Sequence, residues 1–320
     1  MFHSSVFKNI SLFAVFAFLT LYAWLGGYFA KEIITSIAIL SIVAVSLDFV
    51  AGYGGMISLC HGAIYGLGAY MYAISDKLLG LDPFLSIVIA VAICFVFSAF
   101  IGAITSRTHG IFFIMSTLAF GQMAYVLIFD SKALGGDDGM AGISRMDLSF
   151  LGIDLNGSMQ YALLCLTVLL LVYFLLAFLL RSSFGQTLVG VRENEERMRA
   201  LGVSIVKIKT IAFGISGACT ALAGCLVAQH IMFVSPELLF WTVSGEILII
   251  TILGGLGTLV GPIVGAITLI MAKHSLSDYT DHWHLIVGIV LIVVVLANGR
   301  GIFGELQRQY NRLANQKQEK

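Results

Sequence analysis

The sequence predicts an all-α fold, a polytopic transmembrane helical bundle. Hydrophobic residues make up 59% of the 320 residues and charged residues only 11%. Several apolar stretches reach the ~18–20 residues that cross a ~30 Å hydrocarbon core. The clearest are residues 10–29, 84–105, 111–129 and 161–180, which carry their charges at the flanks. A transmembrane β-barrel is excluded because its strands alternate in hydrophobicity and are only about ten residues long.

We expect about ten helices, with eight as the lower limit. In chain order they are placed at residues 10–29, 33–50, 56–74, 84–105, 111–130, 160–180, 208–231, 242–254, 262–275 and 285–298. The first exceeds the ~7–15-residue core of a signal peptide, so we expect a retained helix there. The eighth and ninth are short enough to be re-entrant or half-spanning segments.

The distribution of Lys and Arg predicts the orientation of the chain. With the N-terminus inside, thirteen of the eighteen basic residues fall on the cytoplasmic side and five on the other. This is the bias described by the positive-inside rule. Both termini and the polar loop at 181–207 are therefore expected in the cytoplasm. The transmembrane domain is expected to span residues 1–303, followed by a polar cytoplasmic tail at 304–320.

The polar loop is predicted to contain a short helix over residues 195–201. Asn194 is positioned to cap its N-terminus and Gly202 to end it. Glu195 and Arg199 stand four residues apart, a spacing that predicts an ion pair. Such a short helix is marginal alone in water, so we expect it to dock against another surface. The alternative is a solvated charged loop that only sets the topology.

Two glycine clusters interrupt the apolar sequence and predict helix breaks. The positions concerned are Gly52, Gly54 and Gly55 in the first cluster and Gly254, Gly255, Gly257, Gly261 and Pro262 in the second. Breaks at membrane depth must be buried in protein or line a wet cavity, and in secondary transporters they mark substrate sites. Simple turns or close packing of small residues at the cytoplasmic surface remain the alternative.

Few polar side chains lie within the predicted membrane segments. Asp48 and Glu246 are the carboxylates placed inside helices, where each costs on the order of 2.5–3.5 kcal/mol at the bilayer centre. His61 has no acidic neighbour in the sequence and is more typical of a structural residue than of a proton relay. No spacing of His, Cys, Asp or Glu predicts a metal site, a disulfide or a catalytic cluster, so no cofactor is expected. The formal net charge of zero argues against nucleic acid as a partner.

Six segments, taken in order, carry a resemblance to a known family. They read GYGGMISLCHG at 52–62, STLAFGQM at 116–123, GGDDGM at 135–140, GVRENEERMRALG at 190–202, SGE at 244–246 and GGLGTLVGP at 254–262. Together they resemble the M-type permease subunit of the LIV family of branched-chain amino acid ABC transporters. The resemblance extends from about residue 50 to 303. Cys60 and Gly121 depart from it, standing where a small residue and alanine are common.

The resemblance implies a multi-pass protein of the bacterial inner membrane that works with several other chains. These are an H-type permease, two cytoplasmic ATPases and a periplasmic substrate-binding protein. It also implies that the helix near 194–202 sits in the cleft of an ATPase. The residues expected to couple the two chains are Glu193, Asn194, Glu195, Glu196, Arg197, Arg199, Leu201 and Gly202. The substrate stays open between leucine, isoleucine and valine, other amino acids, urea, amides and aromatic acids.

The first functional hypothesis is therefore a non-catalytic permease subunit of an ATP-driven importer. The chain lacks a GxxxxGK[ST] phosphate loop, so ATP hydrolysis would belong to partner chains. The translocation path is expected to be lined by Ser58, His61, Thr117, Gln122 and Glu246. The alternative is an ion-coupled secondary transporter of a small polar solute, using Asp48, Glu246 and His61.

Overall fold

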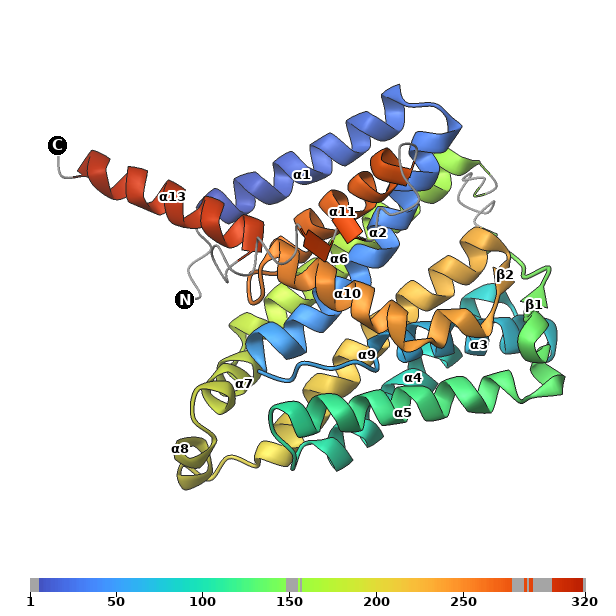
Figure 1. The fold of residues 1–320 in the computed structure, drawn as a ribbon, viewed down its shortest axis with the longest axis horizontal. Helices are drawn as coiled ribbons and strands as arrows, with labels where there is room; N and C mark the ends of the chain where they lie inside the picture. Colours follow the sequence, from blue (N-terminus) through green and yellow to red (C-terminus); the bar gives the residue numbers. More distant parts are fainter. Residues whose placement is uncertain are drawn as a thin grey trace.

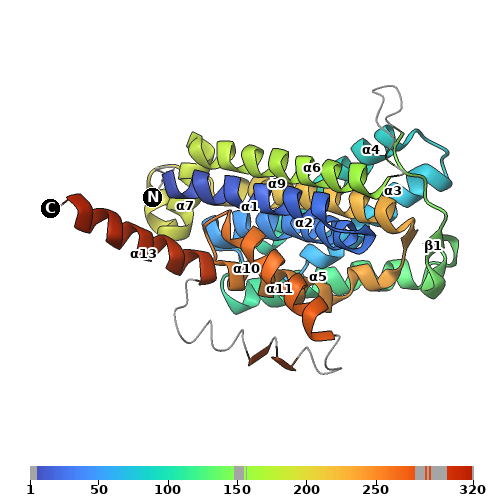
Figure 2. The same ribbon diagram turned by 90° about the horizontal axis from the view of Figure 1, so that it is seen from above.

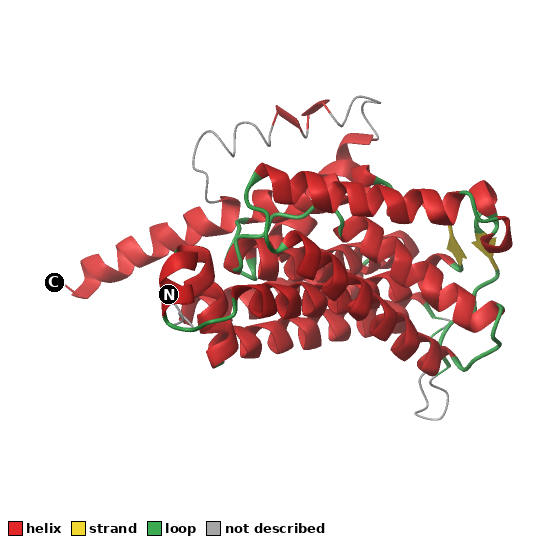
Figure 3. Cartoon of the chain, turned by 90° about the horizontal axis from the view of Figure 1, so that it is seen from below, coloured by secondary structure: helices red, strands yellow, loops and turns green. Residues whose placement is uncertain are grey.

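The computed structural model describes residues 6–147, 155, 157–277, 285–286, 288–289 and 301–318. It confirms the all-α prediction, because helices dominate these residues and the one small β-ribbon lies at an end of the molecule (Figure 3). Nine of the ten predicted transmembrane helices have a counterpart among the described residues. The tenth, predicted at 285–298, lies largely outside them.

Five described helices are long and apolar enough to cross a membrane, and three shorter ones are apolar (Figure 1). The long ones are α2 (Tyr28–Asp48, continued by a π-helix over Phe49–Tyr53), α4 (Pro83–Thr105), α5 (Ile111–Phe129), α6 (Ser158–Arg181) and α9 (Ile205–Ile231). The shorter ones belong to α1 (Val6–Leu25), α10 (Trp241–Gly254) and α11 (Gly261–Ser277). Between α2 and α4 lies α3 (His61–Lys77).

The centre of the bundle is formed by α2 and α9, which are mostly buried. The long helix α9 packs against α3, α4 and α2, and α2 also contacts α6, α10 and α11. Close packing depends on small residues: a Cβ at Gly68 would lie 2.6 Å from the backbone of Ala221, and one at Gly62 would lie 2.6 Å from the backbone nitrogen of Ser244. Glycine at these positions therefore allows α3 to approach α9 and α10 at backbone distance.

The loops gather at two opposite ends of the bundle. One end, the α7–α8 end, carries α7 (Ser183–Glu193) and α8 (Glu195–Ala200) together with the starts of α1 and α13 (Figure 2). The helix α13 (Gly301–Gln318) occupies most of the predicted polar tail and projects away from the bundle there. The α4–α5 loop also lies at this end, since its His109 contacts α8.

The opposite end, the ribbon end, is held by a two-stranded antiparallel ribbon. Strand β1 (Met140–Ala141) pairs with β2 (Phe233–Val234), with Met140 opposite Val234. Short 3-10 turns flank it at Lys132–Leu134, Gly136–Asp138 and Pro236–Leu239. The α3 helix anchors the ribbon end, since Asp76 accepts a hydrogen bond from the Ser144 backbone nitrogen at 2.8 Å and Tyr72 donates to the Ser144 carbonyl at 2.8 Å.

The first glycine cluster breaks the chain later than the sequence predicts, because Gly52 is helical while Gly54 and Gly55 lie in the break. The helix continues through Gly52 as the π-helix, and α3 begins at His61 rather than near residue 56. Residues 54–60 form a non-helical segment whose backbone groups find other partners. The Met56 backbone nitrogen donates to the Val50 carbonyl at 2.9 Å, and the Leu59 nitrogen donates to Thr117 Oγ1 at 3.2 Å. These bonds satisfy buried backbone groups without a helix.

The second glycine cluster breaks the chain as predicted. The short helix α10 ends at Gly254 and α11 begins at Gly261. Between them Gly255 and Gly257 have φ angles of 119° and 77°, a left-handed backbone that glycine adopts at low cost. At 1.5 Å per residue, the fourteen residues of α10 extend roughly 21 Å, short of the ~30 Å hydrocarbon core.

Candidate coupling site

The short helix α8 forms and is capped as the sequence predicts. The backbone of Asn194 is extended (φ −159°), and its Oδ1 accepts a hydrogen bond from the Arg197 nitrogen at 2.8 Å. Gly202 ends the helix with φ of 84°. Beyond it, the Val203 nitrogen returns to the Met198 carbonyl at 3.1 Å, the bond that closes a Schellman-type C-terminus.

Glu195 fastens α8 to the rest of the bundle. Its Oε1 accepts a hydrogen bond from Lys209 Nζ in the first turns of α9, and its Oε2 accepts one from His109 Nε2 at 3.0 Å. The predicted Glu195–Arg199 ion pair is wrong, because both carboxylate oxygens are engaged by these tertiary partners. The Lys209 side chain is only 6% exposed, and a buried ammonium group needs such a counter-charge.

The electrostatics of Glu195 follow from these contacts. Burial raises the pKa of its carboxyl group, but the hydrogen bonds from Lys209 and His109 outweigh burial, so the pKa is lowered below its ordinary value of 4.5. The carboxylate is therefore ionised at neutral pH. Glu195 acts as a clamp between α8, the start of α9 and the α4–α5 loop.

The other face of α8 is turned outward. Glu193, Glu196, Arg197 and Arg199 are exposed, and Leu201 is 71% exposed. Met198 instead lies against α7, where a Cβ at Gly190 would be 2.9 Å from its sulfur. The eight residues expected to couple the chain to a partner thus divide into two groups. Asn194, Glu195 and Gly202 build and hold the helix, while the remaining five form an exposed surface.

Arg192 connects helices α7 and α8 to the first glycine cluster. It lies near the end of α7, a helix that the sequence analysis missed, although Leu188 and Val191 recur at helical spacing and are buried. The Arg192 guanidinium donates a hydrogen bond to the Gly52 carbonyl, and a Cβ at Gly55 would lie 3.0 Å from the arginine Cγ. Nothing in the sequence relates two residues 140 positions apart.

The two glycine clusters meet each other through Asp48. Its carboxylate is fully buried and accepts hydrogen bonds from the backbone nitrogens of Gly257 at 2.5 Å and Leu259 at 2.9 Å. A methyl group at Gly52 would overlap both Asp48 and Gly257. The turn between α10 and α11 is thereby held against the end of α2. A chain of contacts runs from Arg192 through Gly52 to this turn.

A small cavity of about 200 Å³ lies between these elements. Its walls come from residues 54–57, from residues 108–110, 113 and 114, and from Arg192, Glu195 and Lys209. The space separates the non-helical segment from the clamp that holds α8. The cavity therefore lies where the first glycine cluster and the coupling segment approach each other.

The predicted path residues fall into three places. Ser58, His61 and Thr117 gather at the non-helical segment 54–60 and are fully buried. His61 lies between two serines, with Nδ1 3.2 Å from Ser58 Oγ and Nε2 2.9 Å from Ser216 Oγ, an arrangement that suits the structural interpretation.

The other two predicted path residues lie apart from this group. Gln122 is on α5, five residues beyond Thr117, and its Nε2 is buried with no hydrogen-bond partner among the described residues. Glu246 is on α10, facing Lys273 of α11, with 3.9 Å between Oε1 and Nζ. These five side chains therefore do not form one contiguous lining in this conformation.

Fold and site together define a multi-pass membrane protein that presents a capped, clamped helix at one end of its bundle. Residues 29–296 match the family described as "Branched-chain amino acid transport system / permease component", and the chain belongs to this family. The extent of the match agrees with the span of the sequence resemblance.

Named relatives agree with this membership. The chain is 27% identical to the high-affinity branched-chain amino acid transport system permease protein LivM of Salmonella typhimurium, covering 93% of this chain and 76% of the relative. It is 26% identical to the high-affinity branched-chain amino acid transport system permease protein BraD of Pseudomonas aeruginosa, covering 82% of this chain and 91% of the relative. Over 41% of each chain it is 31% identical to the autoinducer 2 import system permease protein LsrC of Escherichia coli. No solved structure matches the chain.

Proposed function

We propose that this chain is a membrane-spanning subunit of an ATP-binding cassette importer that moves branched-chain or related amino acids into the cytoplasm. The observation that carries the proposal is α8, a capped helix with a clamped inner face and an exposed outer face. Family membership supports the permease role, and the names of the LivM and BraD relatives support the substrate class. Energy would come from ATP hydrolysis on partner subunits.

Coupling would act through the contacts of α8. An ATPase that closes on ATP would push the exposed residues Glu196, Arg197, Arg199 and Leu201. Since Glu195 joins α8 to α9 and to the α4–α5 loop, the push would reach both at once. Through Arg192 it would also reach Gly52 and the turn that Asp48 holds. A single displacement of α8 by the ATPase would thus move the elements around both glycine clusters.

The translocation path would open near the non-helical segment 54–60. Ser58, His61 and Thr117 are closed off from solvent here, as expected for a conformation in which the path is shut. Rocking of the small-residue contacts between α3, α9 and α10 would expose them alternately to the two sides. Gln122 and Glu246 would line adjoining stretches of α5 and α10.

The partners follow from the same proposal. We propose an H-type permease beside this chain, two ATP-binding subunits at the α7–α8 end, and a periplasmic substrate-binding protein at the ribbon end. The α7–α8 end would then be cytoplasmic and the membrane would be the bacterial inner membrane. Because the binding protein selects the substrate in such systems, its ligand would decide among the amino acids.

The alternative of an ion-coupled carrier relies on Asp48, Glu246 and His61. Their contacts favour structural roles: Asp48 accepts two backbone hydrogen bonds, Glu246 faces Lys273, and His61 lies between two serines. The two backbone hydrogen bonds that Asp48 accepts hold the turn between α10 and α11 in place, which favours a structural role over proton transport.

Reconstitution separates the two functions. The purified chain is placed in proteoliposomes alone, or together with the partners that copurify with it, and uptake of radiolabelled leucine is measured. We expect uptake only with partners, a binding protein and ATP. Uptake by the chain alone under a proton or sodium gradient would refute the importer proposal and establish the carrier.

A further inference from the structure

A deep groove runs along the outside of the bundle between α1 and α6. It encloses about 640 Å³, and the two helices that form it are both apolar. The side chains that matter here are Phe13 and Phe16 from α1 and Leu170, Phe174, Phe178 and Arg181 from α6. The helix α1 lies at the edge of the bundle (Figure 1). Phe13, Phe174 and Phe178 are exposed, so the groove opens outward, toward the space that a membrane fills.

The length of the groove matches one half of a bilayer. Its α6 residues recur at helical spacing from Leu170 to Arg181, which is roughly 17 Å at 1.5 Å per residue. Half of a ~30 Å hydrocarbon core is about 15 Å. A single acyl chain lying along this face would therefore extend from the midplane to the membrane surface.

The groove ends on a positive charge. Arg181 is the last residue of α6, at the α7–α8 end, and it is exposed. Among the described residues it forms no ion pair, and no acidic side chain lines the groove. A guanidinium group at this depth suits the phosphate of a lipid headgroup, which it binds with two parallel hydrogen bonds. The absence of a neighbouring acid favours a headgroup with net negative charge.

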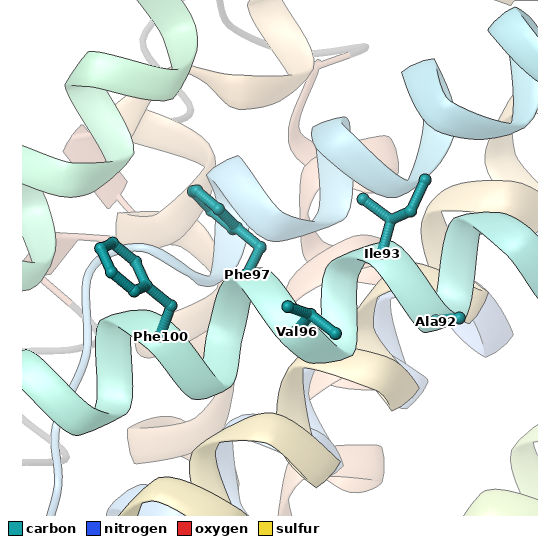
Figure 4. Close-up of a pocket in the computed structure, with 5 residues that line it drawn as sticks. All are labelled: Ala92, Ile93, Val96, Phe97 and Phe100. Carbon is teal, nitrogen blue, oxygen red and sulfur yellow. The ribbon is translucent and has the colours of Figure 1, made fainter.

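A second hollow on the membrane face provides a contrast. It is a shallow depression of about 600 Å³ on α4, and its lining side chains stand along that one helix (Figure 4). They are Ala92, Ile93, Val96, Phe97 and Phe100. No polar side chain is among them, so this surface has nothing to select one lipid headgroup over another. The α1–α6 groove is distinguished by its basic end.

We propose that the α1–α6 groove is a binding site for one anionic phospholipid, with an acyl chain against the phenylalanines and the headgroup phosphate on Arg181. The site is separate from the coupling site and does not depend on the proposed transport function. Its occupant would fill the space between α1 and its neighbour and so hold α1 against the bundle.

Native mass spectrometry of the purified protein, or of its complete complex, tests the site with phosphatidylglycerol and phosphatidylcholine as probes. We expect the wild-type protein to retain phosphatidylglycerol in preference to phosphatidylcholine. Arg181→Gln should lower phosphatidylglycerol retention about tenfold, since it removes a charge-assisted hydrogen bond. Arg181→Lys should retain an intermediate amount, because a lysine keeps the charge but not the bidentate geometry.

Three further variants complete the test. Arg107→Gln is the matched control: Arg107 is an exposed arginine just beyond α4 that does not line the α1–α6 groove, and its loss should leave retention unchanged. Ala177→Phe should displace the acyl chain, since Ala177 lines the groove. Equal retention by Arg181→Gln and Arg107→Gln would overturn the proposal. So would a Phe178→Cys cross-link to another protein chain, which would make the groove a subunit interface.

Discussion

Asp48 is the residue on which the two helix breaks depend. It is fully buried, and its carboxylate oxygens accept hydrogen bonds from Gly257 and Leu259 across 209 and 211 positions of sequence. A buried carboxylate is costly unless it is hydrogen-bonded, and these backbone donors compensate that cost. The residue therefore fixes the turn between α10 and α11 to the end of α2.

Asp48→Asn should destabilise the protein although the two side chains have nearly the same shape. The amide keeps one acceptor oxygen but turns an NH₂ group toward a backbone N–H, leaving that donor unsatisfied at a cost of about 1–3 kcal/mol. Chemical denaturation in detergent should reveal the lower free energy of unfolding. Asp137→Asn, at an exposed position of the ribbon end, is the control. Equal stability of the two variants would show that Asp48 does not hold the turn.

The Glu195 clamp should respond to pH in one direction. Because the folded pKa of this carboxyl lies below its ordinary value of 4.5, folding favours the ionised form. The contribution is complete at neutral pH and is lost as the pH falls below 4.5 through the lowered value. Spin labels at Arg199→Cys and Arg107→Cys should therefore give a narrow distance distribution at neutral pH that broadens in acid.

Two variants separate the loss of the Glu195 contacts from other effects of low pH on the protein. Glu195→Gln should broaden the same distribution already at neutral pH, since it removes the ionic contact with Lys209 and the carboxylate oxygen that faces His109. Glu193→Gln changes an exposed neighbour and should behave like the parent protein. A narrow distribution in Glu195→Gln at neutral pH would mean that α8 is held by something else.

At the scale of elements, the π-helical end of α2 and the α10–α11 turn form one interlocked unit. Gly52 is the position where they touch, and a side chain there has no space because of Asp48 and Gly257. Gly52→Ala should therefore cost about 1–3 kcal/mol of stability, as overpacking does. Gly245→Ala, in the adjoining helix α10 with open space around it, should instead be neutral or stabilise by up to about 1 kcal/mol.

Thermal unfolding of the two glycine variants in the same detergent makes the comparison direct. The pair changes the same atoms in the same protein, so the difference between them reports the contact at Gly52. If Gly52→Ala unfolded at the same temperature as Gly245→Ala, the two breaks would not be interlocked.

The sequence predicts helices well where an apolar stretch is long. Nine helices lie near their predicted positions, and the cap at Asn194 and the stop at Gly202 are confirmed because capping is local chemistry. The predicted helix start at residue 56 is wrong, because residues 56–60 are non-helical and make tertiary hydrogen bonds such as Leu59 to Thr117 instead. The prediction also misses α7, a helix of only eleven residues in a polar stretch.

The site is only partly predictable for a physical reason. The residues of α8 are found because they are consecutive, but their fastening depends on His109, Lys209 and Gly52, which the fold brings from elsewhere. A local rule pairs Glu195 with Arg199, whereas a buried lysine competes more strongly for the same carboxylate. Long-range partners of this kind have no signal in a single sequence.

At the scale of the whole molecule, the loops that the structure describes divide between two ends. Those predicted to be cytoplasmic gather around α7 and α8, and those predicted to be outside gather at the β-ribbon. The asymmetry of Lys and Arg in the sequence orients the bundle, so the α7–α8 end should face the cytoplasm.

Labelling of introduced cysteines checks this orientation. Glu196→Cys should react with a membrane-impermeant maleimide only in inverted vesicles, and Asp137→Cys only in right-side-out vesicles or spheroplasts. The five native cysteines are buried, so background labelling should be low. Labelling of Glu196→Cys from the outside would reverse the topology and with it the assignment of the ATPase side.

The central claim is that α8 receives the movement that ATP hydrolysis drives in a partner chain and transmits it to this chain. The most direct test is the double variant Glu196→Ala/Arg197→Ala, in the transporter reconstituted with its partners, with uptake and ATP hydrolysis measured together. Both side chains are exposed and hold no part of the fold. Lys207→Ala, an exposed basic residue in the first turn of α9, is the control. We predict that uptake falls about tenfold or more, as for loss of an interface hot spot, while membrane insertion is unchanged. Uptake at the rate of the control would contradict the coupling role of α8.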